Sequence, residues 1–323
     1  MRVLVTGCAG FIGSHLCETL LDDGHDVVGV DALTEYYDPT LKFKNLQRCL
    51  GSSSFRFERC LITGLEPRWL EGAELIFHLA AQPGVGASWG PDFETYLNLN
   101  VLNTQYLLER VRYSTSLKRL VYASSSSIYG NTLAERVTED HLKAPYSPYG
   151  VTKLAAEQLC SLYAENFGIS TVSLRLFTVF GPRQRPDMFF SNLISAALTG
   201  RKFILYGDGT MQRDFTSVFD VVEAFRLAAD APIERGSFNI AGGQSISINA
   251  AIEMVEDIAG TRVSIERRSE KKGDVRRTAA DISEAGRQLG FYPHRPLQDA
   301  LREQIEFTDK LLALTLALQG PAC

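Results

Sequence analysis

The stretch "VTGCAGFIGSHL", residues 5–16, decides the fold. It places Gly7, Gly10 and Gly13 between an apolar run and an amphipathic segment, with the spacing GxxGxxG. Glycines at a strand-to-helix turn let the backbone approach a pyrophosphate, which the positive end of the helix attracts. Many tight turns share such glycines, so the weight of this motif depends on the residues that come after it along the chain.

Apolar, β-branched runs alternate with amphipathic segments up to about residue 177 of the 323 residues. Strands are expected at "RVLVTG", "DVVGVD", "AELIFHLAA", "KRLVYASSS" and "TVSLRLF", and helices over residues 11–23, 91–112 and 146–167. Nearly continuous apolar strands that alternate with helices predict a parallel sheet covered on both faces. The expected fold class is therefore α/β, with a Rossmann doubly wound parallel sheet.

The alternation breaks up after about residue 178, where proline, arginine and glycine become frequent. The segment "SFNIAGG" (237–243) is strand-like and could rejoin the sheet. We therefore predict a dinucleotide-binding Rossmann domain from residues 1–177 plus about 215–245. A smaller, interleaved C-terminal substrate domain would comprise residues 178–214 plus about 246–323.

Composition excludes several classes of protein. The net charge of −5 argues against nucleic-acid binding, which needs clustered positive charge. No apolar run is long enough for a membrane span, and the N-terminus lacks the pattern of a signal peptide. Neither the histidines nor the cysteines show metal-ligand spacing, so no metal is expected. The cysteines are expected to be reduced thiols of a cytoplasmic protein: Cys8, Cys17, Cys49, Cys60, Cys160 and Cys323.

The second expected strand ends at Asp31, 18 positions beyond Gly13. A carboxylate at this place can accept hydrogen bonds from an adenosine ribose, and it would repel a 2′-phosphate. The motif therefore favours NAD over NADP. The alternative interpretation is a solvated residue at the end of a strand.

The stretch "PYSPYGVTK" (145–153) places Tyr149 and Lys153 one turn apart on one helix face. An ammonium near a phenol favours the phenolate, which can take a proton from a substrate hydroxyl while a hydride leaves for a nicotinamide. The segment "YASSSSIYG" (122–130) supplies four consecutive serines after a strand. Taken separately, these residues could equally be a surface pair and turn-capping serines.

Together with "HLAA" (78–81), these motifs resemble the extended short-chain dehydrogenase/reductase family that acts on nucleotide sugars, from residue 1 to about 310. The resemblance implies that Ser125, Tyr149 and Lys153 are catalytic, with Ser125 bonded to the 4-hydroxyl of the sugar. It also implies an NAD that is tightly bound and recycled. The implied cofactor-binding residues are Gly7, Gly10, Phe11, Ile12, Gly13, Asp31, Leu79, Ala80, Ala81, Asn100, Tyr149 and Lys153.

The two residues that directly follow Ser125 bear on the type of reaction. Dehydratases of this family carry an Asp–Glu pair there, and decarboxylases usually keep a glutamate at the second position. Ser126 and Ser127 occupy these places here, which favours a 4-epimerase.

Four stretches resemble the UDP-glucuronate 4-epimerase branch: "DALTEYYDP" (31–39), "LRLFTVFGPRQRPDM" (174–188), "GTMQRDF" (209–215) and "GDVRRTAADISEAGRQLGF" (273–291). This likeness implies that Thr178 and the guanidinium of Arg185 grip a C6 carboxylate. The implied substrate-binding residues are Ser125, Ser126, Ser127, Thr178, Arg185, Tyr206, Arg213 and Arg276. Two positions depart from the family pattern, since Cys60 stands where an aspartate is usual and Gly86 where an arginine is common.

The expected reaction is NAD-dependent 4-epimerisation of UDP-glucuronic acid to UDP-galacturonic acid. It would pass through a transient 4-keto sugar, with hydride returned to the opposite face. Alternatives are a UDP-glucuronate decarboxylase, a 4-epimerase of UDP-glucose or UDP-N-acetylglucosamine, and a non-catalytic dinucleotide sensor. The expected partner is a UDP-sugar, without nucleic acid or membrane. The family also implies a homodimer that pairs the helices over 91–112 and 146–167.

Overall fold

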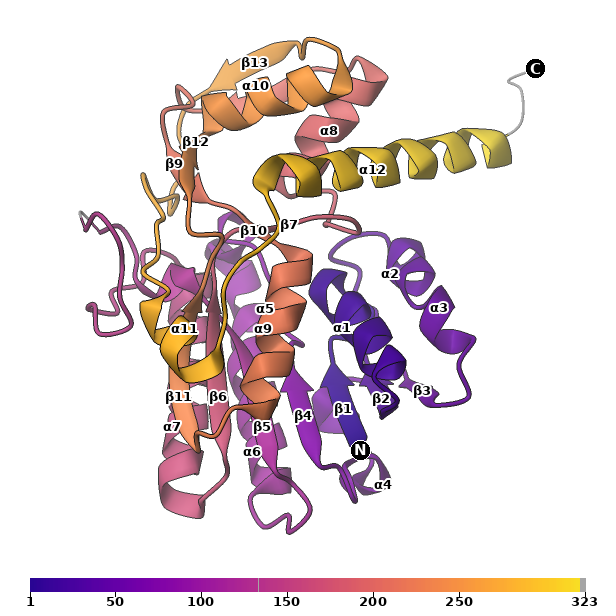
Figure 1. The fold of residues 1–323 in the computed structure, drawn as a ribbon, viewed down its shortest axis with the longest axis vertical. Coiled ribbons are helices and arrows are strands. Elements are labelled where there is room, and N and C mark those ends of the chain that lie inside the picture. The colour runs from indigo at the N-terminus through magenta and orange to yellow at the C-terminus, as the bar shows by residue number, and fades with distance from the viewer. Residues whose placement is uncertain (133, 320–323) are drawn as a thin grey trace.

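The computed structural model describes residues 1–132 and 134–319, so Cys323 lies outside the described residues (Figure 1). Seven strands form one parallel sheet in the order β3-β2-β1-β4-β5-β6-β11. They are β1 (Arg2–Thr6), β2 (Asp26–Val30), β3 (Phe55–Glu58), β4 (Leu75–His78), β5 (Arg119–Ser125), β6 (Thr171–Leu176) and β11 (Arg235–Ile240). The predicted α/β Rossmann-like fold is confirmed, and residues 235–240 do rejoin the sheet.

The register of the sheet aligns the carboxyl ends of its central strands. Thr6 of β1 stands opposite Val30 of β2 and opposite His78 of β4. The residues that come after these strands therefore begin at the same edge. In open α/β sheets this edge is where ligands bind.

Helices cover both faces of the sheet because both faces are apolar. Val3 and Val5 point into the core formed with α1 (Phe11–Asp22) and α9 (Val218–Asp230). Leu4 points into the opposite core, formed with α6 (Asn103–Val111) and α7 (Pro148–Phe167). A strand buried on both sides needs apolar residues at successive positions, which "VLV" supplies.

The three helices expected from the sequence are present. Residues 91–112 contain α5 (Phe93–Tyr96), a π-helical segment (Leu97–Leu102) and α6. The short strand β3 was not predicted, since "FRFE" carries little apolar signal. The remaining helices beside the sheet are α2 (Pro39–Asn45), α3 (Gln47–Leu50), α4 (Pro67–Leu70) and α11 (Ser283–Leu289).

A smaller lobe stands beyond the carboxyl ends of the strands, at the top of Figure 1. Its core combines Phe190, Phe203 and Phe215 with the apolar faces of its helices. Its elements are β7 (Val179–Phe180), α8 (Phe189–Thr199), β8 (Phe203–Tyr206), β9 (Gln212–Asp214), β10 (Thr216–Ser217), β12 (Ser245–Ser247), α10 (Ile248–Ala259), β13 (Ile265–Arg268) and α12 (Leu297–Gln319). The division of the chain into an NAD-binding domain and a substrate domain stays a prediction.

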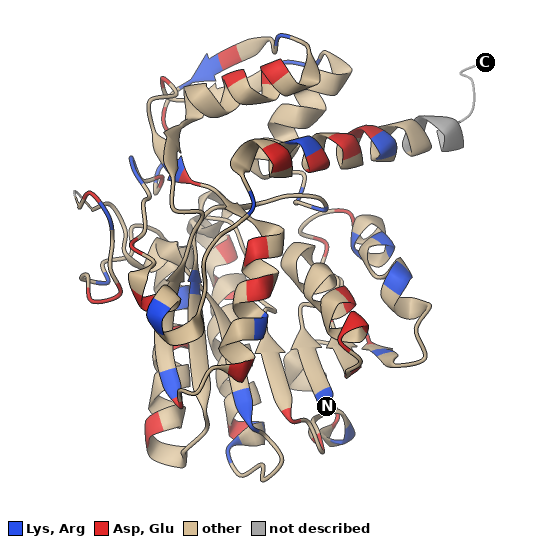
Figure 2. Cartoon of the chain, in the orientation of Figure 1, with Lys and Arg blue, Asp and Glu red and all other residues tan. Residues whose placement is uncertain are grey.

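Charged side chains of both signs are interspersed over the elements seen in Figure 2. Within residues 1–132 and 134–319, no helix combines the length and apolar character that a membrane crossing requires.

Candidate active site

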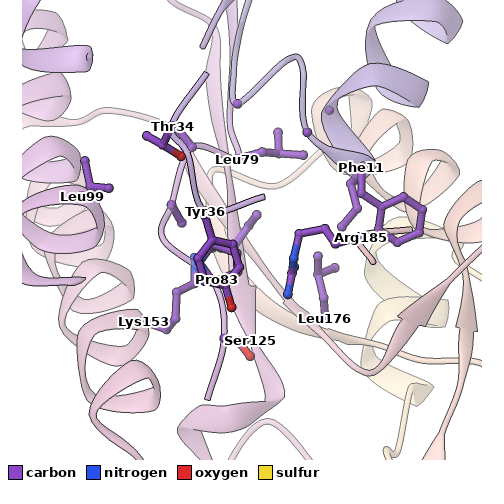
Figure 3. Close-up of a pocket in the computed structure, with 18 of the residues that line it drawn as sticks. Phe11, Thr34, Tyr36, Leu79, Pro83, Leu99, Ser125, Lys153, Leu176 and Arg185 are labelled. Atoms are coloured by element: carbon purple, nitrogen blue, oxygen red, sulfur yellow. Dashed lines mark hydrogen bonds between the residues drawn. The ribbon is translucent and has the colours of Figure 1, made fainter. Parts of the chain in front are cut away.

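A cavity of about 450 Å³ opens at the carboxyl ends of β1, β2, β4 and β5 (Figure 3). Its wall brings together most of the residues singled out in the sequence: Gly7, Gly10, Phe11, Ile12, Gly13, Asp31, Leu79, Ala80, Ala81, Ser125, Ser126, Ser127, Tyr149, Lys153, Thr178 and Arg185. These residues come from six separate stretches of the chain. Five of these stretches lie at or just after the ends of parallel strands, which meet at one edge of the sheet, and the sixth is the first part of α7.

The glycine loop forms one end of this cavity. A side-chain carbon at Gly13 would lie 2.2 Å from the carbonyl oxygen of Gly7, so only glycine lets α1 begin this close to β1. No side chain caps the N-terminus of α1 at Gly10. The first-turn N–H groups and the positive end of the helix are thus suited to a phosphate group.

Asp31 is held in place by the backbone. Its Oδ2 accepts the N–H of Ala9 at 3.1 Å, and its Oδ1 accepts the N–H of Leu33 at 2.8 Å. Burial raises the pKa of this carboxyl, and the two backbone hydrogen bonds oppose that effect. Each oxygen retains a lone pair, so Asp31 can accept the hydroxyls of a ribose lying in the cavity.

Three residues make helix α7 begin beside the run of serines at residues 124–127, called the serine loop below. The hydroxyl of Ser147 accepts the N–H of Gly150 at 3.1 Å, and Pro148 occupies the first turn, where proline is tolerated. A side-chain carbon at Gly150 would lie 2.5 Å from the carbonyl oxygen of Ser127. The sequence "SPYG" therefore presses Tyr149 against the end of β5.

Tyr149 and Ser125 both line the cavity, and the Ser125 hydroxyl faces the phenol of Tyr149 closely enough to affect its pKa. Burial raises the pKa of the Tyr149 phenol, while the hydrogen bond with Ser125 and the positive charge of Arg185 lower it. Lys153 donates to the carbonyl oxygen of Ala123 and lies 4.4 Å from the ring centroid of Tyr122. Burial lowers the pKa of Lys153 to about 7. The serine and Arg185 are thus the groups that favour the phenolate in this structure.

A buried ion pair supports the serine loop from beneath. Arg175 Nε and Nη2 donate to the carboxylate of Glu157, with a shortest distance of 2.6 Å. Ser124 also donates to Glu157 Oε2 at 2.5 Å. Glu157 therefore ties α7 and β6 to the residue that precedes Ser125.

A second buried network runs through His78. Thr104 donates its hydroxyl proton to the carbonyl oxygen of Asn100, so its oxygen must accept Nε2–H of His78 at 2.9 Å. Nδ1 then accepts the hydroxyl proton of Thr6 at 2.8 Å. Burial lowers the pKa of His78 to about 3, so the ring is neutral at pH 7. These contacts lock β1 and β4 to α6.

Asn100 does not line the cavity, although it was expected along the cofactor. Its Oδ1 accepts the N–H of Gln82 at 2.6 Å, and its Nδ2 donates to Thr152 at 2.9 Å. Thr152 in turn donates to the carbonyl oxygen of Tyr149. Asn100 therefore lies behind the cavity wall, where its hydrogen bonds join Gln82 to Thr152.

Three expected substrate residues lie outside the cavity wall, in and beside the smaller lobe. The ring of Tyr206 carries Lys271 Nζ at 3.9 Å from its centroid. Arg213 donates to Asp274 Oδ1 at 2.5 Å, and the backbone carbonyl of Arg276 accepts the N–H of Gln212.

The cavity also has lining residues that the sequence reasoning did not assign. Some come after β2 and others after β4: Thr34, Tyr36, Tyr37, Lys42, Pro83, Gly84 and Val85. Cys60, which departs from the family pattern, follows β3 and lines the cavity too. Loop residues obey no hydrophobic period. The only available signal was the resemblance of "DALTEYYDP", which marked the segment without assigning its side chains.

Comparison with protein families identifies the chain. The family model described as "NAD dependent epimerase/dehydratase family" matches residues 3–241. The chain belongs to this family. The recognition from sequence is confirmed, and family membership makes NAD the cofactor. The uncapped N-terminus of α1 fits its pyrophosphate, and Asp31 fits its adenosine ribose.

Several members of the family are similar over nearly the whole chain. The UDP-glucuronic acid 4-epimerase from Bacillus cereus, solved with UDP-glucuronic acid and NAD, is 40% identical with a TM-score of 0.93, covering 96% of this chain and 100% of that one. MoeE5, solved with UDP-glucuronic acid and NAD and also with UDP-glucose and NAD, is 42–43% identical with a TM-score of 0.88, covering 96–97% of this chain and 100% of its own. The "Uncharacterized UDP-glucose epimerase YtcB" of Bacillus subtilis (strain 168) is 42% identical over 96% of this chain and 99% of its own.

Proposed function

We propose that this NAD-dependent nucleotide-sugar 4-epimerase interconverts UDP-glucuronic acid and UDP-galacturonic acid. The observation that carries the proposal is the shared cavity of Tyr149, Ser125, Thr178 and Arg185. The pair proposed to accept the proton, Tyr149 and Ser125, and the pair proposed to bind the carboxylate, Thr178 and Arg185, line one space. The similarity to the Bacillus cereus enzyme, which is named for this substrate, supports the same assignment.

The chain's own residues would perform the proton transfer and the positioning. Tyr149 would take the proton of the 4-hydroxyl, and Ser125 would hold that oxygen by a hydrogen bond. Lys153 would fix the nicotinamide ribose from the next turn of α7. When bound, NAD supplies the acceptor and donor of a hydride at C4.

The carboxylate makes orientation essential. A uronic acid oxidised at C4 is a β-keto acid, which loses CO₂ when the C5–C6 bond stands perpendicular to the ketone plane. Thr178 and Arg185 would hold the carboxylate away from that alignment, with Ser126 and Ser127 supporting the ring. Neither serine can act as a carboxylic acid at C5, which disfavours the decarboxylase and dehydratase alternatives.

A second candidate substrate is a neutral UDP-hexose. Arg185 is not a free cation, because Asp187 forms a two-point salt bridge with it. The Bacillus subtilis relative named for UDP-glucose is consistent with this alternative.

We further propose that Tyr206, Arg213 and Arg276 contact the UDP part of the substrate. Arg213 and the backbone of Arg276 are joined through Gln212, so they belong to one cluster of the smaller lobe. The Rossmann domain would then bind NAD, and the smaller interleaved domain would bind the UDP part of the substrate.

A homodimer is proposed through α7 and the segment before α6. Leu97, Leu102, Val151 and Leu162 leave 42–52% of their surface exposed on these elements. Such apolar exposure is suited to a partner helix. Leu159, by contrast, packs partly inside the chain. Light scattering of wild type and Leu102→Lys tests this proposal, which requires a dimer that the lysine weakens.

Product analysis tests the carboxylate clamp, which is the pair Thr178 and Arg185. Thr178→Ala and Arg185→Ala should lower turnover of UDP-glucuronic acid and release CO₂ with a UDP-pentose product. The matched control is Arg201→Ala, which removes an arginine bonded to Asn192 outside the cavity. Clean epimerisation at the wild-type rate by both clamp variants would refute the proposed role.

A further inference from the structure

The Arg185 side chain lines the cavity and is paired with the carboxylate of Asp187. Its Nε and Nη2 each donate to one oxygen of Asp187, both at 3.0 Å. The guanidinium carbon also lies 5.6 Å from the ring centroid of Tyr36, whose hydroxyl reaches the same carboxylate at 3.4 Å. In Figure 3 the Arg185 side chain points toward the space between Tyr36 and Ser125.

This pairing leaves one edge of the guanidinium available. The five N–H groups of arginine form two donor edges, and Asp187 uses the edge that contains Nε. Both N–H groups of Nη1 and one of Nη2 remain for a ligand. The remaining edge can bind a carboxylate in bidentate geometry, or the hydroxyl of a neutral sugar.

The pairing also removes the net charge of the clamp. The charged residues that line the cavity are Asp31, Lys42, Lys153 and Arg185. Asp31 and Lys42 attract each other at the end beside β2, and Lys153 is bonded to Ala123 in the opposite wall. Next to the expected position of C6, the Arg185–Asp187 pair is therefore close to neutral.

We propose that Asp187 is a specificity-determining residue that acts through Arg185. By neutralising the guanidinium it weakens the binding of a carboxylated sugar, so that the site also accepts a neutral UDP-hexose. Tyr36 gives Arg185 a second contact besides Asp187, because the guanidinium carbon lies 5.6 Å from its ring centroid. This inference rests on the proposed function, in which Arg185 faces C6. Asp187 is 44% exposed at its side chain, so changing its charge is compatible with folding.

The test measures binding, not turnover. Asp187→Asn is placed in a Tyr149→Phe background, which blocks proton transfer, and the NAD-loaded full chain is titrated with UDP-glucuronic acid and with UDP-glucose by calorimetry. We expect UDP-glucuronic acid to bind about tenfold more tightly, while UDP-glucose changes by less than about twofold, because the added positive charge acts only on the carboxylate. The gain should shrink in 0.5 M NaCl, since salt screens the carboxylate–guanidinium attraction.

Two controls separate charge from structure. Asp187→Glu keeps the charge and should keep the affinity ratio of the two ligands. Asp23→Asn breaks a salt bridge with Arg226 outside the cavity and should change neither ligand. The proposal is overturned if Asp187→Asn weakens both ligands together or leaves their ratio unchanged, or if Asp187→Glu shifts the ratio as strongly. These outcomes do not depend on whether wild type epimerises UDP-glucuronic acid, so failure of the proposed function would be recognised separately.

Discussion

Replacing Glu157 by glutamine tests how the active-site serines are supported. The Glu157 side chain is 1% exposed and that of Arg175 is 5% exposed, so their ion pair is removed from water. The glutamine amide keeps the volume and one acceptor. Its NH₂ group, however, must face either the guanidinium or the hydroxyl of Ser124, and the charge of Arg175 loses its partner.

The structure sets the size of the effect. Removing one partner of a buried ion pair costs about 3–5 kcal/mol, because an uncompensated charge remains in a low-dielectric interior. The retained acceptor places this variant near the lower end, about 3 kcal/mol. At about 2 °C per kcal/mol for a large domain, the midpoint of unfolding should fall by about 6 °C.

Thermal unfolding and steady-state turnover together form the assay. Turnover should also decrease, because Ser124 precedes Ser125 and loses its hydrogen bond to Glu157. The matched control is Glu223→Gln, which makes the same change in a pair whose side chains are 34–36% exposed. Its midpoint should fall by less than about 2 °C, since exposed pairs contribute about 0–1 kcal/mol. Equal midpoints for Glu157→Gln and wild type would refute the reasoning.

Three further predictions concern single side chains. Because burial lowers the pKa of Lys153 to about 7, the folded protein binds fewer protons than the unfolded chain between pH 7 and the ordinary lysine pKa of 10.5. The contribution of this group to stability should therefore be lowest below pH 7 and rise with pH. Wild type should gain stability relative to Lys153→Met between pH 7 and 9. A constant difference between the two melting temperatures across that range would contradict the prediction. His78→Phe should destabilise by about 2–4 kcal/mol, since it leaves the buried hydroxyl proton of Thr6 without its acceptor and takes away the N–H that Thr104 accepts; a denaturant midpoint equal to wild type would show that these two hydrogen bonds contribute nothing. A side-chain carbon at Gly86 would meet no atom within 4 Å, so Gly86→Arg should fold normally and lower KM for UDP-glucuronic acid several-fold without lowering that for UDP-glucose; an equal change in both KM values would speak against an anion contact there.

Local patterns allowed much of the cofactor end of the site to be predicted. The glycine spacing and the strand end at Asp31 describe a turn whose geometry is set within a few residues, so the cavity wall contains both. The spacing of Tyr149 and Lys153 likewise results from one helix. The periodicity of helices and strands was enough to predict these positions.

Long-range pairing could not be predicted in the same way. Nothing in "PDM" indicates that Asp187 also meets Tyr36, because that contact joins residues 151 positions apart. The position of Asn100 behind the wall depends on Gln82 and Thr152, which lie on separate elements. The hydrogen bond from Lys153 to the carbonyl of Ala123 likewise joins separate elements, while the action of Lys153 on the phenol of Tyr149 stays a prediction.

The most direct test of the proposed reaction is a proton NMR time course of the purified protein with UDP-glucuronic acid, with and without added NAD. The proposed mechanism predicts new anomeric and H4 signals of UDP-galacturonic acid at the expense of UDP-glucuronic acid, without CO₂ release. Formation of a UDP-pentose, or epimerisation of UDP-glucose alone while UDP-glucuronic acid stays unchanged, would contradict it.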